Sequence, residues 1–357
     1  AVCPTSVVRS RHLDAGSRPG AASRARDSLA AFAADGGDCD HEPPRLKRDV
    51  SQTENKSLRP KVYTATISTA DMTVTRARDA EHQLWQHYGL TVAEQFVEIE
   101  SPRLRIRVLE CGSQAGEPLV FVQGGLGEAF GWASLMAKLT DLRCISLDRP
   151  GGGFSDGVNF LEVDVRKLAV DVLQAVLHAA GVSRAAFVAN SMGGWWTFQF
   201  ARSAPAHVSR MVMIGCPAVI LDTSAPLPMR LISIPMLGHG LVKLMAASSP
   251  AKAREVPRFL GHPIEVGQRW PDAEAETTYW VSNLPNARRS WLTLLRRFLT
   301  PWGSSREMRI GADELRRVAQ PTLFVWGERD PFGSIDSGHA AVALMPDAQL
   351  KVVGIGH

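Results

Sequence analysis

Cysteine is scarce in this sequence: the 357 residues contain five, an odd number, spread widely and without Cys-x-x-Cys spacing. This usage argues against a disulfide framework and a zinc site, and it fits the reducing cytoplasm. Neither sign of charge dominates, since 40 Lys and Arg face 36 Asp and Glu. No basic block is interleaved with aromatic residues, so nucleic acid is not an expected partner.

Long hydrophobic runs are also missing. The most apolar segment, residues 231–247, is interrupted by Pro235, His239 and Lys243. It falls short of the roughly 20 apolar residues that span a bilayer. We therefore expect no membrane span.

The first 71 residues contain no Met and no Trp, although the whole chain has ten Met and nine Trp. This stretch is rich in Arg, Ala, Ser, Asp and Gly and shows no helical or strand periodicity, so it is predicted to be a disordered extension. An alternative interpretation is that native translation begins at Met72 and that the upstream part is not native.

The remaining residues are predicted to form one large α/β domain. Residues 96–99 and 104–109 favour an antiparallel hairpin around Ser101 and Pro102, and short, wholly apolar runs then alternate with helical stretches, as in a parallel sheet covered on both faces. The expected strands are 119–122, 144–147, 186–189, 211–214, 322–326 and 350–353. The core is thus expected at 72–216 and 312–357.

Between residues 217 and 311 the strand rhythm stops, and prolines and apolar helical patches predict a helical cap over one end of the sheet. The tryptophans of this insertion are expected to pack in its core: Trp270, Trp280, Trp291 and Trp302. Its methionines suggest an apolar underside: Met229, Met236 and Met245.

A serine lies between a buried strand and a helix in the run Val-Ala-Asn-Ser-Met-Gly-Gly (residues 188–194). A serine in such a turn has a strained backbone and requires small residues two positions away on each side. Ala189 and Gly193 meet this need around Ser191, and the N–H groups of the following helix favour negative charge there. Ser191 is a candidate nucleophile; the alternative is a serine that caps the helix.

A glycine-rich loop follows another apolar strand, in the run Val-Gln-Gly-Gly-Leu-Gly (residues 122–127). Glycine lets the backbone approach a ligand closely. The N–H groups of Gly125 and Met192 are candidate donors of an oxyanion hole, in which one donor is worth about 2.7–4 kcal/mol of transition-state stabilisation. Taken alone, the loop is equally explained as a turn.

A nucleophilic serine needs a base and a carboxylate that orients the base. Asp330 follows the predicted strand 322–326, and His357 follows the predicted strand 350–353. Both lie where the carboxyl ends of parallel strands meet, as Ser191 does, and the chain order is Ser, Asp, His.

Other residues have simpler explanations. His339 is expected on a surface helix, and Glu328 is a weaker candidate than Asp330 for orienting the base. Three cysteines near strand ends are expected to be small core residues: Cys111, Cys144 and Cys216.

Together the motifs resemble the α/β-hydrolase fold superfamily over roughly residues 96–357. A fifth run, Asp-Arg-Pro-Gly-Gly-Gly-Phe-Ser (148–155), is similar to the family's turn after the fourth strand. The resemblance implies a mostly parallel sheet flanked by helices, a serine hydrolase triad, and neither cofactor nor metal. The implied nucleophile, general base, orienting carboxylate and oxyanion-hole donors are Ser191, His357, Asp330, Gly125 and Met192.

The chain departs from the family pattern at three places. Ala189 stands where Gly is usual, and Gln123 replaces a His that holds the oxyanion loop. The chain also stops at His357, where the family continues with a helix behind the histidine. We therefore expect a C-terminally truncated form with little activity.

The leading functional hypothesis is a cofactor-independent cytoplasmic serine hydrolase that cleaves a small or medium apolar carboxylic ester through an acyl-enzyme on Ser191. The first alternative is a carbon–carbon bond hydrolase of meta-cleavage products that uses the same triad, because the run 190–194 also resembles the elbow of those enzymes. Against it, the loop at Gln123 lacks the expected Ser, Gly and Pro composition. The second alternative is a catalytically inactive ligand-binding protein.

Overall fold

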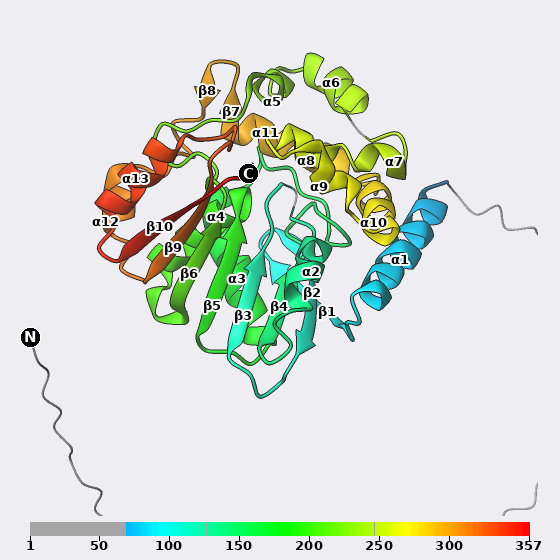
Figure 1. Ribbon diagram of the computed structural model, residues 1–357, viewed down its shortest axis with the longest axis horizontal. Coiled ribbons are helices and arrows are strands. Elements are labelled where there is room, and N and C mark those ends of the chain that lie inside the picture. The colour runs from blue at the N-terminus through cyan, green and yellow to red at the C-terminus, as the bar shows by residue number, and fades with distance from the viewer. Residues whose placement is uncertain (1–68, 126, 246) are drawn as a thin grey trace, which may run out of the picture. The chain divides into compact units, whose positions relative to one another are not determined.

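The structure is a computed structural model and describes residues 69–125, 127–245 and 247–357 (Figure 1). The predicted disordered extension therefore lies outside the described residues, apart from its last three. For residues 69–71 the prediction is wrong, because they form the first turn of helix α1 (Thr69–His87). Asp71 is favourable there, since a carboxylate in the first turn complements the helix dipole.

An eight-stranded sheet forms the centre of the described chain, in the order β1-β2-β4-β3-β5-β6-β9-β10. Every strand expected from an apolar run is present, with slightly wider bounds. The strands are β1 (Ala93–Glu100), β2 (Arg103–Gly112), β3 (Pro118–Val122), β4 (Arg143–Leu147), β5 (Ala185–Asn190), β6 (Val208–Ile214), β9 (Thr322–Gly327) and β10 (Ala348–Val353).

The strand directions follow the two sequence patterns. Strands β1 and β2 pair antiparallel with Ile99 opposite Leu104, and β2 pairs antiparallel with β4. All other neighbours in the sheet are parallel. The mostly parallel α/β sheet predicted from the sequence is confirmed.

Helices pack against the sheet and bury its apolar side chains. Helices α3 and α4 pack on each other, and α4 contacts β3, β5 and β6, while α13 contacts β9 and β10. The helical elements outside the insertion, apart from α1, are the 3-10 turns η1 (Ala129–Trp132) and η2 (Pro205–His207) and helices α2 (Ala133–Met136), α3 (Val165–Ala179), α4 (Ser191–Ser203), α12 (Ala312–Arg316) and α13 (Ile335–Leu344).

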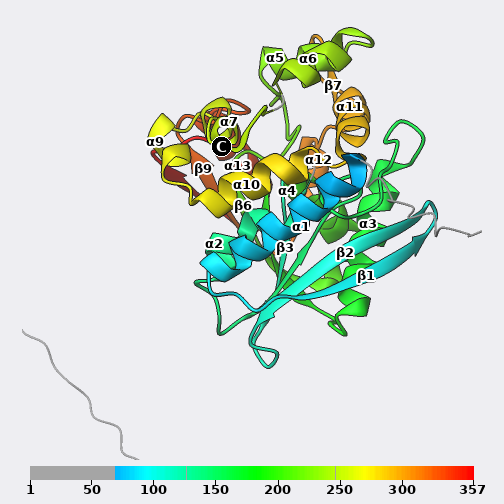
Figure 2. The same ribbon diagram turned by 90° about the vertical axis from the view of Figure 1, so that its right-hand side faces the viewer.

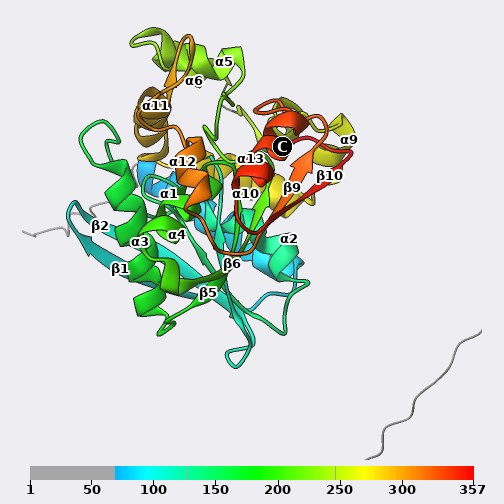
Figure 3. The same cartoon turned by 90° about the vertical axis from the view of Figure 1, so that its left-hand side faces the viewer.

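The predicted helical insertion lies between β6 and β9. Its two ends pair through a parallel bridge between Ile220 and Ile310. In Figures 2 and 3, seen from opposite sides, α5, α6 and α11 lie at the same end of the molecule. Its elements are α5 (Leu227–Ile232), α6 (Leu237–Met245), α7 (Pro250–Ala253), α8 (Val256–Phe259), α9 (Ile264–Gln268), α10 (Asp272–Ser282), α11 (Ala287–Phe298), β7 (Leu299–Thr300) and β8 (Gly303–Ser304).

No helix in the described part of the chain has the length and apolar character needed to cross a bilayer.

A buried ion cluster ties α1 to the sheet. The Arg107 guanidinium on β2 donates to both carboxylate oxygens of Glu81 on α1, at 2.8 and 2.5 Å, and to Asp148 Oδ2 at 3.2 Å. All three side chains are at most 4% exposed. Desolvation works against the charge of Arg107, but the carboxylates of Asp148 and Glu81 more than offset it and raise the pKa of Arg107. The cluster holds two carboxylates that have no access to water.

Replacing Arg107 by Ala is expected to lower the free energy of unfolding by about 3–5 kcal/mol, because it leaves two buried carboxylates without their cation. Chemical denaturation measures this change. Arg105→Ala is the matched control: its ion pair with Asp156 is exposed, so a loss below about 1 kcal/mol is expected. Equal losses in the two variants would contradict the role of the buried cluster.

Candidate active site

Ser191 occupies a strained turn between β5 and α4. Its φ is 50°, a left-handed conformation that a side chain rarely adopts. A Cβ atom added to Gly193 would lie 1.9 Å from the carbonyl oxygen of Val122, so only glycine allows α4 to approach β3 this closely. The strained serine turn with a small residue at position 193, predicted from the sequence, is present.

Asn190, not Ser191, stands at the N-cap position of α4, and its side chain makes no capping hydrogen bond. Its Oδ1 instead accepts a hydrogen bond of 2.6 Å from the N–H of Gly124. The alternative in which Ser191 merely caps the helix is therefore not supported. Asn190 was not singled out in the sequence, although it precedes the serine directly.

The glycine loop (residues 123–128) lies directly against the serine turn. A Cβ atom added to Gly124 would lie 2.8 Å from the Cβ of Ser191. Gly125 has a φ of 56°, and its N–H donates no hydrogen bond within the described chain. Met192 lies in the first turn of α4, where N–H groups have no intrahelical acceptor. Neither candidate oxyanion-hole N–H therefore has an acceptor within the described residues.

Asp148 and Arg149 hold the glycine loop and the residue that follows it through hydrogen bonds to their backbone. The Arg149 guanidinium donates to the carbonyl oxygens of Gln123, at 2.9 Å, and Gly125, at 2.5 Å. Asp148 accepts the N–H of Ala129 at 2.6 Å. Because both charged residues are fully buried, these bonds form where water does not compete. The resemblance implies that the run 148–155 is a structural element near the site, and these hydrogen bonds show which atoms of the glycine loop it holds.

Asp330 and His357 meet as expected. The Nδ1 of His357 lies 2.8 Å from Asp330 Oδ2, and their side chains are 2% and 0% exposed. Asp330 also accepts the N–H groups of Cys216 and Phe332, each at 2.8 Å. These two donors fix the carboxylate so that one oxygen faces the imidazole.

The other ring nitrogen of His357, Nε2, is buried and has no hydrogen-bond partner within the described residues. It is therefore not bonded to Ser191. The two residues nevertheless lie at one edge of the sheet: Gly215, at the end of β6, is next to the imidazole, and β6 pairs with β5, which ends at the serine turn. The N–H of Ala218 donates to the carbonyl oxygen of Ser191 at 2.9 Å.

The helical insertion contacts the histidine directly. The backbone N–H of His357 donates to the carbonyl oxygen of Leu260 at 2.7 Å, and Nε2 of His262 lies 2.8 Å from the carbonyl oxygen of His357. Leu260 and His262 lie between α8 and α9 and were missed in the sequence. No local signal marks them, because the contact spans 95 residues.

The remaining candidates behave as the simpler explanations predict. His339 is exposed on α13, and Glu328 is exposed and does not contact the imidazole. The three cysteines in the described chain are buried and unpaired: Cys111, Cys144 and Cys216. Burial raises the pKa of Cys216 well above its usual value, which disfavours the reactive thiolate. The described residues contain no cluster of His, Cys, Asp or Glu placed to hold a metal.

Glu128, at the end of the glycine loop, was also missed. Desolvation by the surrounding protein raises its pKa to about 7, and the negative charge of Asp148 adds to the effect, while Arg149 opposes it. Glu128 is half-buried, and the charged groups that act on it are Asp148 and Arg149.

The fold and the site together define a hydrolase of the α/β class. The sequence profile of the alpha/beta hydrolase fold family matches residues 117–357, so the chain belongs to this family. The superfamily resemblance noted in the sequence is confirmed, and the family match supports the expectation of an enzyme.

Curated relatives are named as hydrolases of 2-hydroxy-6-oxo acids with conjugated double bonds. The chain is 28% identical over 264 residues to a 2-hydroxy-6-oxononadienedioate/2-hydroxy-6-oxononatrienedioate hydrolase of Burkholderia vietnamiensis, covering 72% of this chain and 86% of that protein. It is 26% identical over 275 residues to a 2-hydroxy-6-oxo-6-phenylhexa-2,4-dienoate hydrolase of Burkholderia cepacia, covering 73% and 88%.

Solved structures share the fold at lower identity. A carboxylesterase of Bacillus subtilis matches with a TM-score of 0.60 and 18% identity, over 80% of this chain and 92% of that one. A 2-hydroxy-6-oxo-6-phenylhexa-2,4-dienoate hydrolase of a Rhodococcus strain matches with a TM-score of 0.59 and 18% identity, over 74% and 91%. These similarities establish the fold alone.

The raised pKa of Glu128 makes stability depend on pH. Protonation of the folded state contributes stability that is fully present below the ordinary pKa of 4.5 and is lost as the pH rises through about 7. Glu128→Gln should therefore gain stability relative to the parent protein as the pH is raised over this interval. Chemical denaturation at several pH values measures the difference. Replacing the exposed Glu98 by Gln should give no such pH-dependent difference in stability. A difference between Glu128→Gln and the parent protein that does not change with pH would contradict the raised pKa of Glu128.

Proposed function

We propose that the protein is a serine hydrolase that cleaves a carbon–carbon bond next to a ketone, in a meta-cleavage product such as a 2-hydroxy-6-oxo-dienoate. The observation that carries the serine chemistry is the buried Asp330–His357 pair, whose free Nε2 lies at the same sheet edge as Ser191. The choice of bond rests on the relatives, whose names describe such substrates. The comparisons thus favour the first alternative of the sequence analysis over its leading ester hypothesis.

In the proposed reaction, His357 Nε2 accepts the proton of the Ser191 hydroxyl as the oxygen attacks the ketone carbon. The N–H groups of Gly125 and Met192 stabilise the resulting oxyanion. The bond breaks from the keto tautomer of the substrate, in which the proton of the 2-hydroxyl has moved to C5. When the oxyanion collapses, the C5–C6 bond breaks, and its electron pair passes through the C3–C4 double bond to the C2 oxygen, which takes up the proton from the imidazolium. Water, activated by His357, then releases the acyl group from Ser191 as a carboxylic acid.

The missing bond between Ser191 and His357 is compatible with this sequence of steps. Catalytic hydrogen bonds are often long in ligand-free enzymes and shorten when substrate binds. Asp330 meanwhile keeps the proton on Nδ1, so that Nε2 is the nitrogen able to act as base.

The buried, free thiols of Cys111, Cys144 and Cys216 support a cytoplasmic enzyme.

Ester hydrolysis by the same residues is the second candidate. It requires no electron sink in the leaving group, and the composition of the glycine loop around Gln123 favours it. The two reactions share the acyl-enzyme and differ only in the group that leaves.

The substrate is tested by measuring kcat/KM for 2-hydroxy-6-oxo-6-phenylhexa-2,4-dienoate beside a p-nitrophenyl ester of an apolar acid. We expect the dienoate to be the better substrate, because the relatives that the chain resembles are named for such dienoates. A higher kcat/KM for the ester would reject carbon–carbon cleavage and leave the serine mechanism in place.

The triad is tested with a fluorophosphonate, which reacts only with an activated serine. Ser191→Ala should abolish labelling, and Asp330→Asn should lower kcat by about 10⁴-fold, because Asn favours the wrong imidazole tautomer. Ser203→Ala, an exposed serine at the other end of α4, is the matched control and should label normally. Persistent labelling of Ser191→Ala would disprove the proposed nucleophile.

A further inference from the structure

One surface of the helical insertion carries charge of a single sign. Residues 223–247 and 285–306 contain no Asp or Glu. They form α5, α6, α11 and the β7–β8 hairpin, which contact one another and lie together in Figures 2 and 3. We call these four elements the basic face. Its cations are Arg230, Lys243, Arg288, Arg289, Arg296, Arg297 and Arg306.

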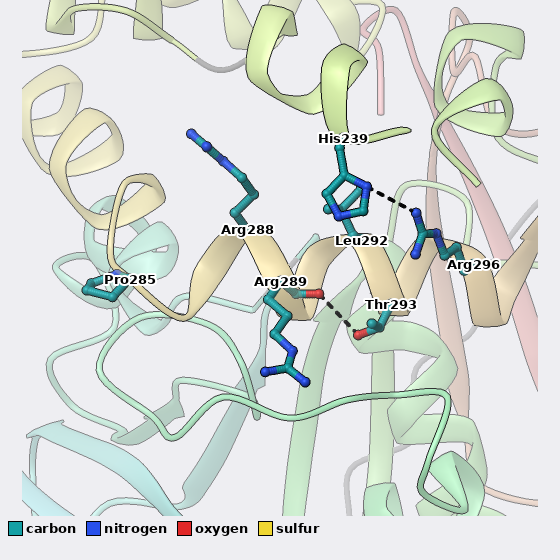
Figure 4. Close-up of a pocket in the computed structure, with 7 residues that line it drawn as sticks. All are labelled: His239, Pro285, Arg288, Arg289, Leu292, Thr293 and Arg296. Carbon is teal, nitrogen blue, oxygen red and sulfur yellow. Dashed lines mark hydrogen bonds between the residues drawn. The ribbon is translucent and has the colours of Figure 1, made fainter. Parts of the chain in front are cut away.

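The basic face holds a cavity of about 430 Å³ between α6 and α11. Arg288, Leu292 and Arg296 are spaced four residues apart on α11 and share one side of that helix, toward His239 of α6 (Figure 4). Arg289 points the other way in the same view. The lining of the cavity therefore combines the arginine side chains with the apolar side chain of Leu292.

The arginines of this cavity lack acidic partners. Within the described residues, the side chains of Arg288 and Arg289 form neither an ion pair nor a hydrogen bond, and Arg296 reaches only His239, at 3.4 Å. The Nε atom of Arg296 is buried without a partner. Arg297, on the same helix, is by contrast paired with Glu307. Free cations around a cavity are suited to an anionic ligand.

Large apolar side chains stand exposed on the same elements. Trp302, in the β7–β8 hairpin, is 91% exposed, and Met236, directly before α6, is 88% exposed. Leu227 and Leu237 are about half exposed. The expectation that Trp302 packs in the core and that Met236 belongs to an apolar underside is therefore wrong. Both residues lie at connections between short elements, where no neighbouring segment covers them.

The spacing of the cations favours an extended anionic surface over one small anion. Arg288 and Arg296 are eight residues apart, which is about 12 Å along the helix. In Figure 4 the Arg288 side chain extends away from Arg296, so the two do not converge on one point. Exposed Trp, Met and Leu beside unpaired cations are typical of segments that lie in the interface of an anionic bilayer.

We propose that the basic face docks the protein onto an anionic lipid bilayer. Trp302, Met236 and Leu237 enter the boundary between head groups and acyl chains, while Arg288 and Arg296 bind lipid phosphates at the cavity. This docking is peripheral, and it is independent of the reaction proposed for Ser191.

The test is co-sedimentation of the full chain with vesicles of phosphatidylcholine, with and without phosphatidylglycerol. We expect binding to the anionic vesicles that weakens as salt is raised, and little binding to phosphatidylcholine alone. The double variant Arg288→Gln with Arg296→Gln should weaken binding by about tenfold to thirtyfold, because each of the two lost cations weakens binding to an anionic bilayer by a similar factor. Trp302→Ser with Met236→Ser should weaken it without changing its salt dependence.

The matched control replaces Arg103 and Arg317 by Gln; both are exposed and lie outside the basic face, so binding should change by less than about twofold. Thermal unfolding with inorganic phosphate identifies a soluble anion as the alternative ligand. Stabilisation by phosphate that depends on Arg288 and Arg296, without sedimentation on anionic vesicles, would overturn the proposal. Equal binding to both vesicle types, or equal losses in the control variant, would overturn it as well.

Discussion

Two adjacent buried charges, Asp148 and Arg149, set the position of the glycine loop. A loop with several glycines has little intrinsic preference for one conformation, so its shape must come from outside. Arg149 binds two of its carbonyl oxygens, and Asp148 binds the first N–H beyond it, while Arg107 balances the charge of Asp148. Without this support the N–H of Gly125 would have no fixed direction beside Ser191.

The same support explains the family's turn after the fourth strand. Asp148 also accepts the N–H of Phe154, and the Cβ of any residue at position 153 would collide with its carboxylate. Glycine at 153, with a φ of 51°, therefore lets the turn close around the aspartate. One short run of sequence thereby positions a loop that precedes it by about 25 residues. The chemistry at the serine turn depends on these buried bonds as much as on the serine itself.

Local patterns in the sequence predicted the parts of the structure that local physics determines. The apolar runs of β4 and β5 became strands that are buried on both faces, whereas β10, at the edge of the sheet, has no buried residue. Ser191 took its strained turn because Gly193 leaves room for the approach of β3. Contacts between distant segments could not be predicted in this way. His262 reaches His357 across 95 residues, and Glu81 reaches Arg107 only after α1 packs on the sheet. The exposure of Trp302 likewise depends on which neighbours fail to cover it, and composition does not show this.

The helical insertion acts on two sides of the molecule. Toward the core, Leu260 and His262 bind the backbone of His357, so the position of the proposed base depends on the fold of the insertion. Away from the core, its arginines remain unpaired around a cavity, whereas the core pairs Arg107, Arg143 and Arg166 with carboxylates. Clustered cations repel one another and destabilise the folded chain. A surface that keeps such a cluster, next to exposed Trp and Met side chains, is better explained by an anionic partner than by stability.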